Sequence, residues 1–295
     1  MSWQKSIEEL RRRERLAEKM GGEEPVSRQR GRGKLTVRER VAFLADPGSF
    51  HEIGKIAGKA TYTVDDELES FSPSTGGGSI KSLEKDPRTY IPETPGWNEI
   101  THGLTQVPFV SLALGPCAGM GAGRVAASHF SVMVKELSQV FVAGPPVAIA
   151  LGENVTKEEL GGWKIQGQNG TVDNVVDSEA DAFETARRFL SYLPASVHEL
   201  PERVPPRDKP DRREESLLSI VPTDGKTPYK PRKIVEATVD TGSFFEIGHD
   251  WGRGIVCGFA RVDGYPVGIL AGDPFFLDGA WTADVCDKVT RHMDL

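Results

Sequence analysis

The chain has 295 residues, and its 36 basic and 43 acidic side chains give a formal net charge of −7, which argues against a broad nucleic-acid-binding surface. Its 38% hydrophobic and 27% charged residues are typical of a globular protein with room for two domains. The cysteines Cys117, Cys257 and Cys286 form no CxxC pair, and no apolar run reaches membrane-spanning length, so we expect no metal site, no disulfide framework and no membrane span.

Two helices are expected near the N-terminus. Residues 5–20 begin with a capping-box pair, Ser6 and Glu9, and carry a thin apolar stripe. A second helix is expected to be capped by Thr36 and Glu39. Its inward face is expected to carry Val37, Val41 and Leu44.

A nine-residue segment occurs twice in the chain. DPGSFHEIG at 46–54 recurs as DTGSFFEIG at 240–248, and seven of the nine positions are identical. Chance does not easily produce such a match, so we expect two copies of one domain. Two strands about Asp263-Gly264 are expected after the second copy. No such hairpin is expected after the first copy, which leads into a glycine-rich turn at 75–81.

The stretch from 107 to 147 organises the rest of the chain. Val107 to Leu114 has the length of a strand and the composition of one buried on both faces. Small residues follow, and a helix that begins near Gly119 or Gly121 would aim its unpaired N–H groups at whatever lies above the strand. Backbone donors of this kind can hold a developing oxyanion without a charged side chain.

Further elements are expected on the C-terminal side of this stretch. Strands are predicted at 130–134 and 140–143. Thr156 and Glu159 should cap a short helix, and Ser178 should begin a longer one. Residues 199–232 contain seven prolines and many charges, which is typical of an interdomain linker.

Several segments together carry a family resemblance. They are GKLTVRERVAFLADPGSFHEIG (33–54), TGGGSIK (75–81), RTYIPETPGW (88–97), LALGPCAGMGAGRVAASHFSVMV (112–134), SQVFVAGPPV (138–147), VTKEELGG (155–162), NGTVDN (169–174) and FLSYLP (189–194). With these segments in this order, the sequence resembles the β subunit, or carboxyltransferase component, of biotin-dependent acyl-CoA carboxylases of the propionyl-CoA/acetyl-CoA type.

The resemblance implies an α/β fold of two homologous crotonase-like (ClpP/crotonase) domains, each with a core sheet flanked by helices. Residues 1–198 would form the N-terminal, acyl-CoA-binding domain, lacking a hairpin between 74 and 75. Residues 199–232 would be the linker, and 233–295 the incomplete start of the biotin-binding domain. We expect the 295 residues to be the ordered parts of a longer polypeptide rather than a true truncation.

The resemblance also implies an activity and its partners. The family moves a carboxyl group from N1 of carboxybiotin to the α-carbon of an acyl-CoA, in a ligase complex. Biotin would be carried on a biotin carboxylase or biotin carrier subunit, which uses ATP and bicarbonate. The chain would form a dimer-based homo-oligomer, a hexamer. We expect a cytoplasmic protein, or a mitochondrial matrix protein if it is eukaryotic, with no nucleic-acid or membrane partner.

The site residues follow from the matched motifs. Gly76 and Gly77 would be catalytic, as the oxyanion hole of the first half. The acyl-CoA contacts would be Gly78, Gly115, Pro116, Cys117, Ala118, Gly119, Gly121, Phe141, Ala143, Gly144 and Pro145. Cys117 is interpreted as a small core residue rather than a nucleophile, and His129 as a structural histidine rather than a base.

The chain departs from the family at two positions, and two other functions stay open. Where the family often has an alanine and a histidine after EELGG, this chain has Trp163 and Gln166, which argues against a standard small acyl substrate. The glycines at 119–123, with Glu136 on a ribose, could belong to a dinucleotide-binding oxidoreductase, but the full GxGxxG register is missing. A truncated, non-catalytic subunit could bind acyl-CoA or partner subunits without turnover.

Overall fold

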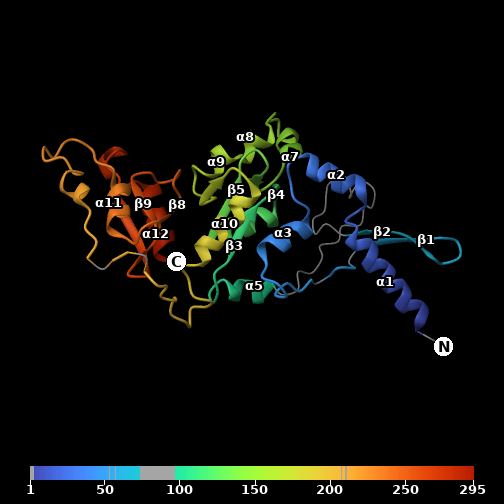
Figure 1. Ribbon diagram of the computed structural model, residues 1–295. Helices are drawn as coiled ribbons and strands as arrows, with labels where there is room; N and C mark the ends of the chain where they lie inside the picture. Colours follow the sequence, from blue (N-terminus) through green and yellow to red (C-terminus); the bar gives the residue numbers. More distant parts are fainter. Residues whose placement is uncertain (1–2, 53, 57, 74–96, 207, 210) are drawn as a thin grey trace. The chain divides into compact units, whose positions relative to one another are not determined.

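The computed structural model describes residues 3–52, 54–56, 58–73, 97–206, 208–209 and 211–295 (Figure 1). The chain divides into two compact units, Met1–Pro95 and Gly96–Leu295. The linker expected at 199–232 therefore runs within the second unit. Each unit is described by itself.

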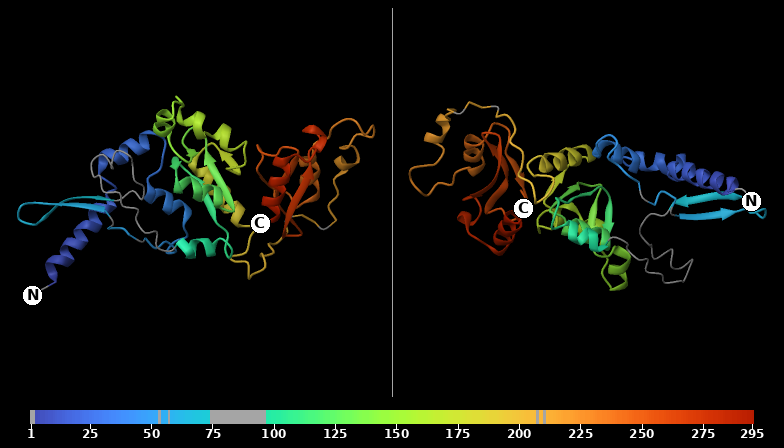
Figure 2. Two further views of the ribbon diagram at one scale, coloured as in Figure 1. Left: turned by 180° about the vertical axis from the view of Figure 1, so that it is seen from behind. Right: turned by 90° about the horizontal axis from the view of Figure 1, so that it is seen from below.

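The described part of the first unit combines helices with a hairpin. Its elements are α1 (Gln4–Glu18), α2 (Glu23–Gly31), α3 (Val37–Leu44), β1 (Gly58–Tyr62) and β2 (Leu68–Pro73). The two strands are antiparallel, and α1 lies alongside them (Figure 2). Leu68 and Phe71 are the buried apolar residues of β2, and Ala17 is the buried residue of α1. The Tyr62 hydroxyl donates to Glu9 Oε1 at 2.9 Å and fastens the hairpin to the helix.

The structure corrects three expectations for this unit. Helix α1 has Trp3 at its N-cap with no side-chain cap, so the predicted capping box of Ser6 and Glu9 is wrong. The predicted inward face of α3 is also wrong, because Val37 is 60% exposed. A hairpin does follow the first copy of the repeat, since β1 pairs with β2. The Thr36–Glu39 capping box is confirmed, with Thr36 N donating to the Glu39 carboxylate at 2.7 Å.

A parallel sheet lies at the centre of the second unit. Its strands β3 (Val110–Ala113), β5 (Phe130–Val134) and β7 (Asn174–Val176) lie in the order β3-β5-β7. All five residues of β5 are buried, as its apolar sequence predicts. A second parallel pair joins β4 (Pro116–Ala118) to β6 (Gln139–Phe141).

Helices cover and connect these strands (Figure 1). They are α5 (Trp97–Gly103), α6 (Met120–Ala127), α7 (Pro145–Ala150), α8 (Lys157–Gly161), α9 (Trp163–Gln166) and α10 (Glu179–Leu190). Helix α10 packs on β3, β5 and β7 through the side that carries Ala182, Phe183, Ala186 and Phe189. The predicted caps Thr156 on α8 and Ser178 on α10 are both confirmed.

The C-terminal elements form an antiparallel sheet and two helices. They are α11 (Pro231–Thr238), β8 (Phe245–Ile247), β9 (Ile255–Val262), β10 (Tyr265–Gly272) and α12 (Ala283–Met293), with 3-10 turns at Glu215–Leu218 and Leu277–Gly279. The strand order is β10-β9-β8, and the predicted hairpin about Asp263-Gly264 is confirmed.

One core joins the parallel and antiparallel sheets. The rings of Phe130 in β5 and Phe189 in α10 stack with their centroids 4.4 Å apart. Phe245 of β8 packs edge-on against Phe130 at 5.7 Å, and Phe259 of β9 packs against Phe189 at 5.9 Å. Aromatic side chains bury much apolar area, so this cluster holds the segment after the linker onto the segment before it.

The two copies of the repeat share a preceding helix and a closed turn, although only the second contains a strand among the described residues. Helices α3 and α11 precede them at equivalent positions, and each has 8 residues. The turn is closed by Ser49 N donating to Asp46 O at 3.0 Å in the first copy, and by Ser243 N donating to Asp240 O at 2.9 Å in the second. The same element therefore occurs once in each compact unit.

Candidate active site

A glycine turn lies just beyond the carboxyl end of β3. After Gly115 the chain forms the short strand β4, and Gly119 then adopts φ +57° as the N-cap of α6. A positive φ suits glycine, because it has no Cβ to clash with the backbone. The helix predicted to begin near Gly119 is thus confirmed. Its first N–H groups have no acceptor within the helix, so they are available to a ligand.

The segment after β6 lies against this turn. Strands β4 and β6 pair in parallel, with Cys117 opposite Val140 and Ala118 opposite Phe141. Gly119 N donates to Val142 O at 2.8 Å and fixes the turn against the end of β6. The structure therefore brings 115–121 together with 141–145, as the site prediction requires.

The Gly144-Pro145 part of the predicted site opens a helix rather than a loop. Gly144 is the N-cap of α7, and two prolines occupy its first positions. Proline is favoured there because its missing N–H would have had no acceptor and its φ is already helical. Phe141 is only 8% exposed, and its ring lies 3.6 Å from the position of a Cβ on Gly144. Phe141 is thus a buried side chain that packs beneath Gly144 at the start of α7.

The turn is open on the side of the small residues. A Cβ added to Gly121 or Gly123 would meet no heavy atom of the described residues within 4 Å. Met120 in the turn and Val142 after β6 are exposed apolar residues, and so are Val147, Ile149 and Leu151 in and just after α7. This surface therefore offers backbone donors beside an apolar rim, which suits a ligand with a polarised carbonyl and an apolar chain.

Three of the predicted residues are not described. Gly76, Gly77 and Gly78 lie outside the described residues, so the prediction that they meet the Gly115 turn stays a prediction.

The predicted role of His129 is confirmed. Its Nδ1 accepts a hydrogen bond from Phe109 N at 2.9 Å, and burial lowers its pKa below the usual value of 6.5. The backbone holds the ring in place, as expected for a structural histidine. Cys117 packs partly buried on the cluster around Met133 and Val140, and its Sγ lies 3.3 Å from Gly115 O. This agrees with a small packing residue.

Helix α9 makes contacts that the sequence does not reveal. Gln166 Nε2 donates to Val140 O at 2.6 Å, and the residue is only 8% exposed. Trp163 Nε1 donates to Glu136 Oε1 at 3.1 Å. Both residues were noted only as departures from the family motif. A hydrogen bond between residues 26 or 27 positions apart leaves no periodic signal in the sequence.

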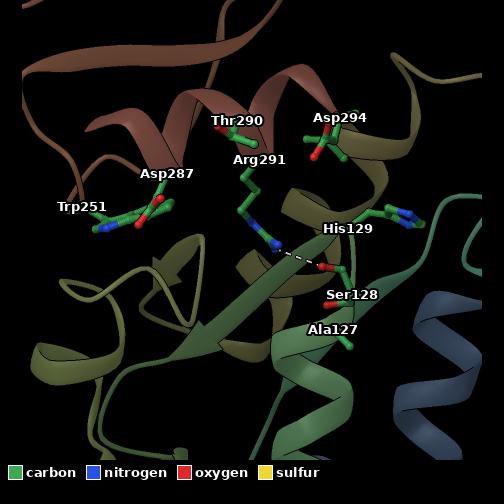
Figure 3. Close-up of a pocket in the computed structure, with 9 residues that line it drawn as sticks. Ala127, Ser128, His129, Trp251, Asp287, Thr290, Arg291 and Asp294 are labelled. Atoms are coloured by element: carbon green, nitrogen blue, oxygen red, sulfur yellow. Dashed lines mark hydrogen bonds between the residues drawn. The ribbon is translucent and has the colours of Figure 1, made fainter. Parts of the chain in front are cut away.

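A separate cavity of about 400 Å³ lies at the opposite end of the parallel sheet (Figure 3). It lies at the amino end of β5, beside Ser128 and His129. Figure 3 shows Arg291 of α12 reaching in to donate to Ser128 O at 2.9 Å. Arg291 also forms a bidentate pair with the buried Asp173, with both contacts at 2.7 Å. These contacts hold α12 on the sheet, and ligands of parallel sheets favour the carboxyl ends instead.

The described part of the chain contains neither a group of side chains that could bind a metal ion nor a membrane-spanning helix. Its residues contain no group of three or more His, Cys, Asp or Glu side chains placed to hold a metal ion. None of the helices there is both long and apolar enough to cross a membrane.

Comparison with known proteins identifies the family. Residues 98–295 match the model of the carboxyl transferase domain. The chain belongs to the carboxyl transferase domain family. It is 30% identical to the carboxyltransferase subunit of propionyl-CoA carboxylase from Haloferax mediterranei, over 99% of this chain and 67% of that protein. It is 29% identical to the α subunit of methylmalonyl-CoA decarboxylase from Veillonella parvula, over 98% and 68%.

Solved structures of carboxyl transferases agree with this assignment. Transcarboxylase 12S, crystallised as a hexamer with hydrolysed methylmalonyl-CoA bound, superposes with a TM-score of 0.78 at 25% identity over 99% of this chain and 68% of that one. A single-chain, multi-domain long-chain acyl-CoA carboxylase superposes with a TM-score of 0.74 at 23% identity, over 98% and 35%. The family resemblance and the crotonase-like α/β fold are thereby confirmed. The matched family and relatives are carboxyl transferases and carboxylases, and they give no support to a dinucleotide-binding oxidoreductase.

Proposed function

We propose that the chain is the carboxyltransferase component of a biotin-dependent acyl-CoA carboxylase. The observation that carries this proposal is the glycine turn just beyond the carboxyl end of β3, where Gly119 is the N-cap of α6 with no side-chain cap and Met120 and Val142 are exposed. The chain belongs to the carboxyl transferase family, so the reaction that these backbone N–H groups would assist is carboxyl transfer. The substrate is an acyl-CoA, and the product carries a new carboxyl group on its α-carbon.

The reaction places negative charge where the turn can stabilise it. The acyl-CoA loses a proton from its α-carbon and becomes an enolate, whose thioester oxygen carries the charge. N–H groups of the first turn of α6 would donate to that oxygen, and in a site with little water such donors are worth far more than in bulk solvent. Gly76 and Gly77 are proposed as the second source of donors, and Gly78 as a further contact.

Carboxybiotin on a partner subunit would supply the carboxyl group that bonds to the enolate α-carbon, and biotin N1, released from the carboxyl carbon, would leave with the α-proton. The partner charges biotin with ATP and bicarbonate. The donor set fits such a transfer, because backbone N–H groups stabilise an oxyanion without competing as nucleophiles. What this chain does is hold the thioester, orient its α-carbon and exclude water.

We propose a dimer-based hexamer in the cytoplasm. The related transcarboxylase 12S was crystallised as a hexamer, and the described repeat elements give the chain two homologous surfaces that two-fold symmetry can pair. Sedimentation of the purified chain at micromolar concentration tests the assembly. A monomer that carboxylates acyl-CoA would contradict it.

A non-catalytic, acyl-CoA-binding subunit is the alternative. Incubation with carboxybiotin carrier and a panel of acyl-CoAs separates the two. Catalysis predicts carboxylated product, whereas the alternative predicts acyl-CoA binding without product. Binding is measured independently by alkylation of Cys117, because bound acyl-CoA should cover the 115–121 turn and slow the reaction of that thiol.

A further inference from the structure

Helix α9 contacts the segment 136–141, which leads into the candidate site, at two places. At one end, Trp163 donates to Glu136 at 3.1 Å, and Glu136 lies in the turn between β5 and β6 with φ +58°. At the other end, Gln166 donates to Val140 O within β6 at 2.6 Å. The helix thus holds the start and the middle of the segment 136–141.

The contact is tight because glycine precedes the helix. A Cβ on Gly161 would lie 2.1 Å from Val140 O, so the end of α8 fits against β6 only without a side chain. Gln166 is almost fully buried, and its backbone carbonyl oxygen accepts a hydrogen bond from Val172 N at 3.1 Å, which fixes the main chain at this residue. If the side-chain amide of Gln166 moved away, Val140 O would lose the hydrogen bond that this amide donates.

Movement of β6 would reach the glycine turn directly. Val140 lies opposite Cys117 in the β4–β6 pair, and Gly119 N donates to Val142 O at 2.8 Å. The indole of Trp163 packs on the same core cluster as Cys117. A shift at Gln166 is therefore transmitted through β6 to the first turn of α6.

We propose that Trp163 and Gln166 are positioning residues that set the place of β6 and thereby select the acyl group. This inference rests on the proposed function. One methylene more or less in an apolar pocket changes kcat/KM about 10–200-fold, so a small displacement of the wall is enough to alter the choice among acyl chains.

The test uses the full chain with its biotin-carrying partner and a homologous series of acyl-CoAs from acetyl-CoA upward. Gln166→Met keeps the volume but removes the donor, and Trp163→Phe removes the indole N–H. Both are expected to change the kcat/KM ratio between the best substrate and its next homologue at least fivefold. Gln166→His offers a ring N–H and should bring the ratio back toward the wild-type value.

Ile165→Ala is the matched control on the same helix, because the Ile165 side chain is 39% exposed, whereas Gln166 is only 8% exposed. It should leave the ratio within twofold. Folded Gln166→Met and Trp163→Phe proteins with wild-type ratios would overturn the inference. If Gln166→Met does not fold, Trp163→Phe decides by itself. Wild-type protein that carboxylates no acyl-CoA would instead contradict the proposed function.

Discussion

Arg232 and Glu246 form an ion pair of 2.5 Å that is repeated 194 residues earlier as Arg38 and Glu52 at 3.3 Å. In each copy the arginine lies in the helix before the repeat and the glutamate near the end of the repeat. The second pair has an additional partner, since Arg232 also contacts Asp273 at 2.8 Å. The duplication thus extends from sequence to side-chain contacts, and one copy has buried its pair more deeply.

The two pairs should differ in their effect on stability. Arg232→Met leaves Asp273, whose side chain is 3% exposed, without its partner, and should lower the free energy of unfolding by about 3–5 kcal/mol. Arg38→Met breaks a pair whose side chains are 38% and 34% exposed, and should cost about 0–1 kcal/mol. Urea unfolding of both variants measures the difference. Equal losses would contradict this account of burial.

His292 should make the protein less stable in mild acid. Burial is the main cause that lowers its pKa below 6.5, and the nearby Lys288 lowers it further. Below pH 6.5 the unfolded chain therefore binds the proton more readily, and the free energy of unfolding falls as the pH falls through the folded pKa. His292→Phe should flatten this dependence because it removes the titrating group. The substitution breaks no hydrogen bond at Nδ1, since this atom has no partner among the described residues.

Chemical denaturation between pH 5 and 8 follows this effect. His102→Gln is the control, since the side chain of His102 is exposed in α5 and its loss should leave the slope unchanged. An unchanged slope in His292→Phe would show that another group causes the acid sensitivity.

Gly121 offers a clean test of the glycine turn. Gly119 has φ +57°, so a side chain there would strain the backbone and confuse folding with binding. A Cβ at Gly121 meets no described atom outside its own helix within 4 Å, so valine there should change stability by no more than about 0.5 kcal/mol. It would occupy the space of the ligand and raise KM for acyl-CoA at least tenfold.

Gly272→Val is its matched control in β10, where a Cβ also meets no described atom within 4 Å. Steady-state kinetics of both variants give the answer. A Gly121→Val enzyme with wild-type KM would remove this turn from the acyl-CoA site.

The cysteines should react in a fixed order with iodoacetamide. Cys286 is exposed and should be alkylated first. Cys257 is 1% exposed, and burial raises the pKa of its thiol to about 11, so it should stay unreacted at pH 8 in the folded protein. Cys117 should react at an intermediate rate that acyl-CoA slows. Peptide mass spectrometry with and without acyl-CoA reads all three sites, and early modification of Cys257 would contradict the fold.

The sequence predicts the centre of the fold because the local signals there agree with the tertiary structure. The apolar runs of β3 and β5 and the small residues of α6 identify two strands, a turn and a helix. The burial expected on both faces of the first strand is wrong, because Val110–Leu112 are only half-buried, whereas every residue of β5 is buried. The hairpin β1–β2 escapes prediction because β1 is largely exposed and its sequence, GKATY, has no apolar run. Helix α7 escapes it because Gly144 and two prolines resemble a loop, although proline suits the first turn of a helix.

The local backbone structure of the candidate site could be predicted from the sequence, but the contacts that support it could not. Gly119 and the segment 141–145 were found because glycine and proline mark where the chain turns. The contact of Gln166 was not, since its partner Val140 is 26 residues away, and neither was the pair of Arg291 and Asp173 at the opposite end of the sheet, 118 residues apart. Such contacts depend on how helices settle on the sheet, and no local pattern encodes that.

The most direct test of the proposed function follows the carboxyl group itself. Biotin carrier charged with isotopically labelled carboxyl is mixed with this chain and an acyl-CoA, and acid-stable label in the CoA product is measured. The account predicts label on the α-carbon that requires the chain and falls at least tenfold in Gly121→Val at subsaturating acyl-CoA. Label that never reaches any acyl-CoA, or that reaches it equally without the chain, would contradict it.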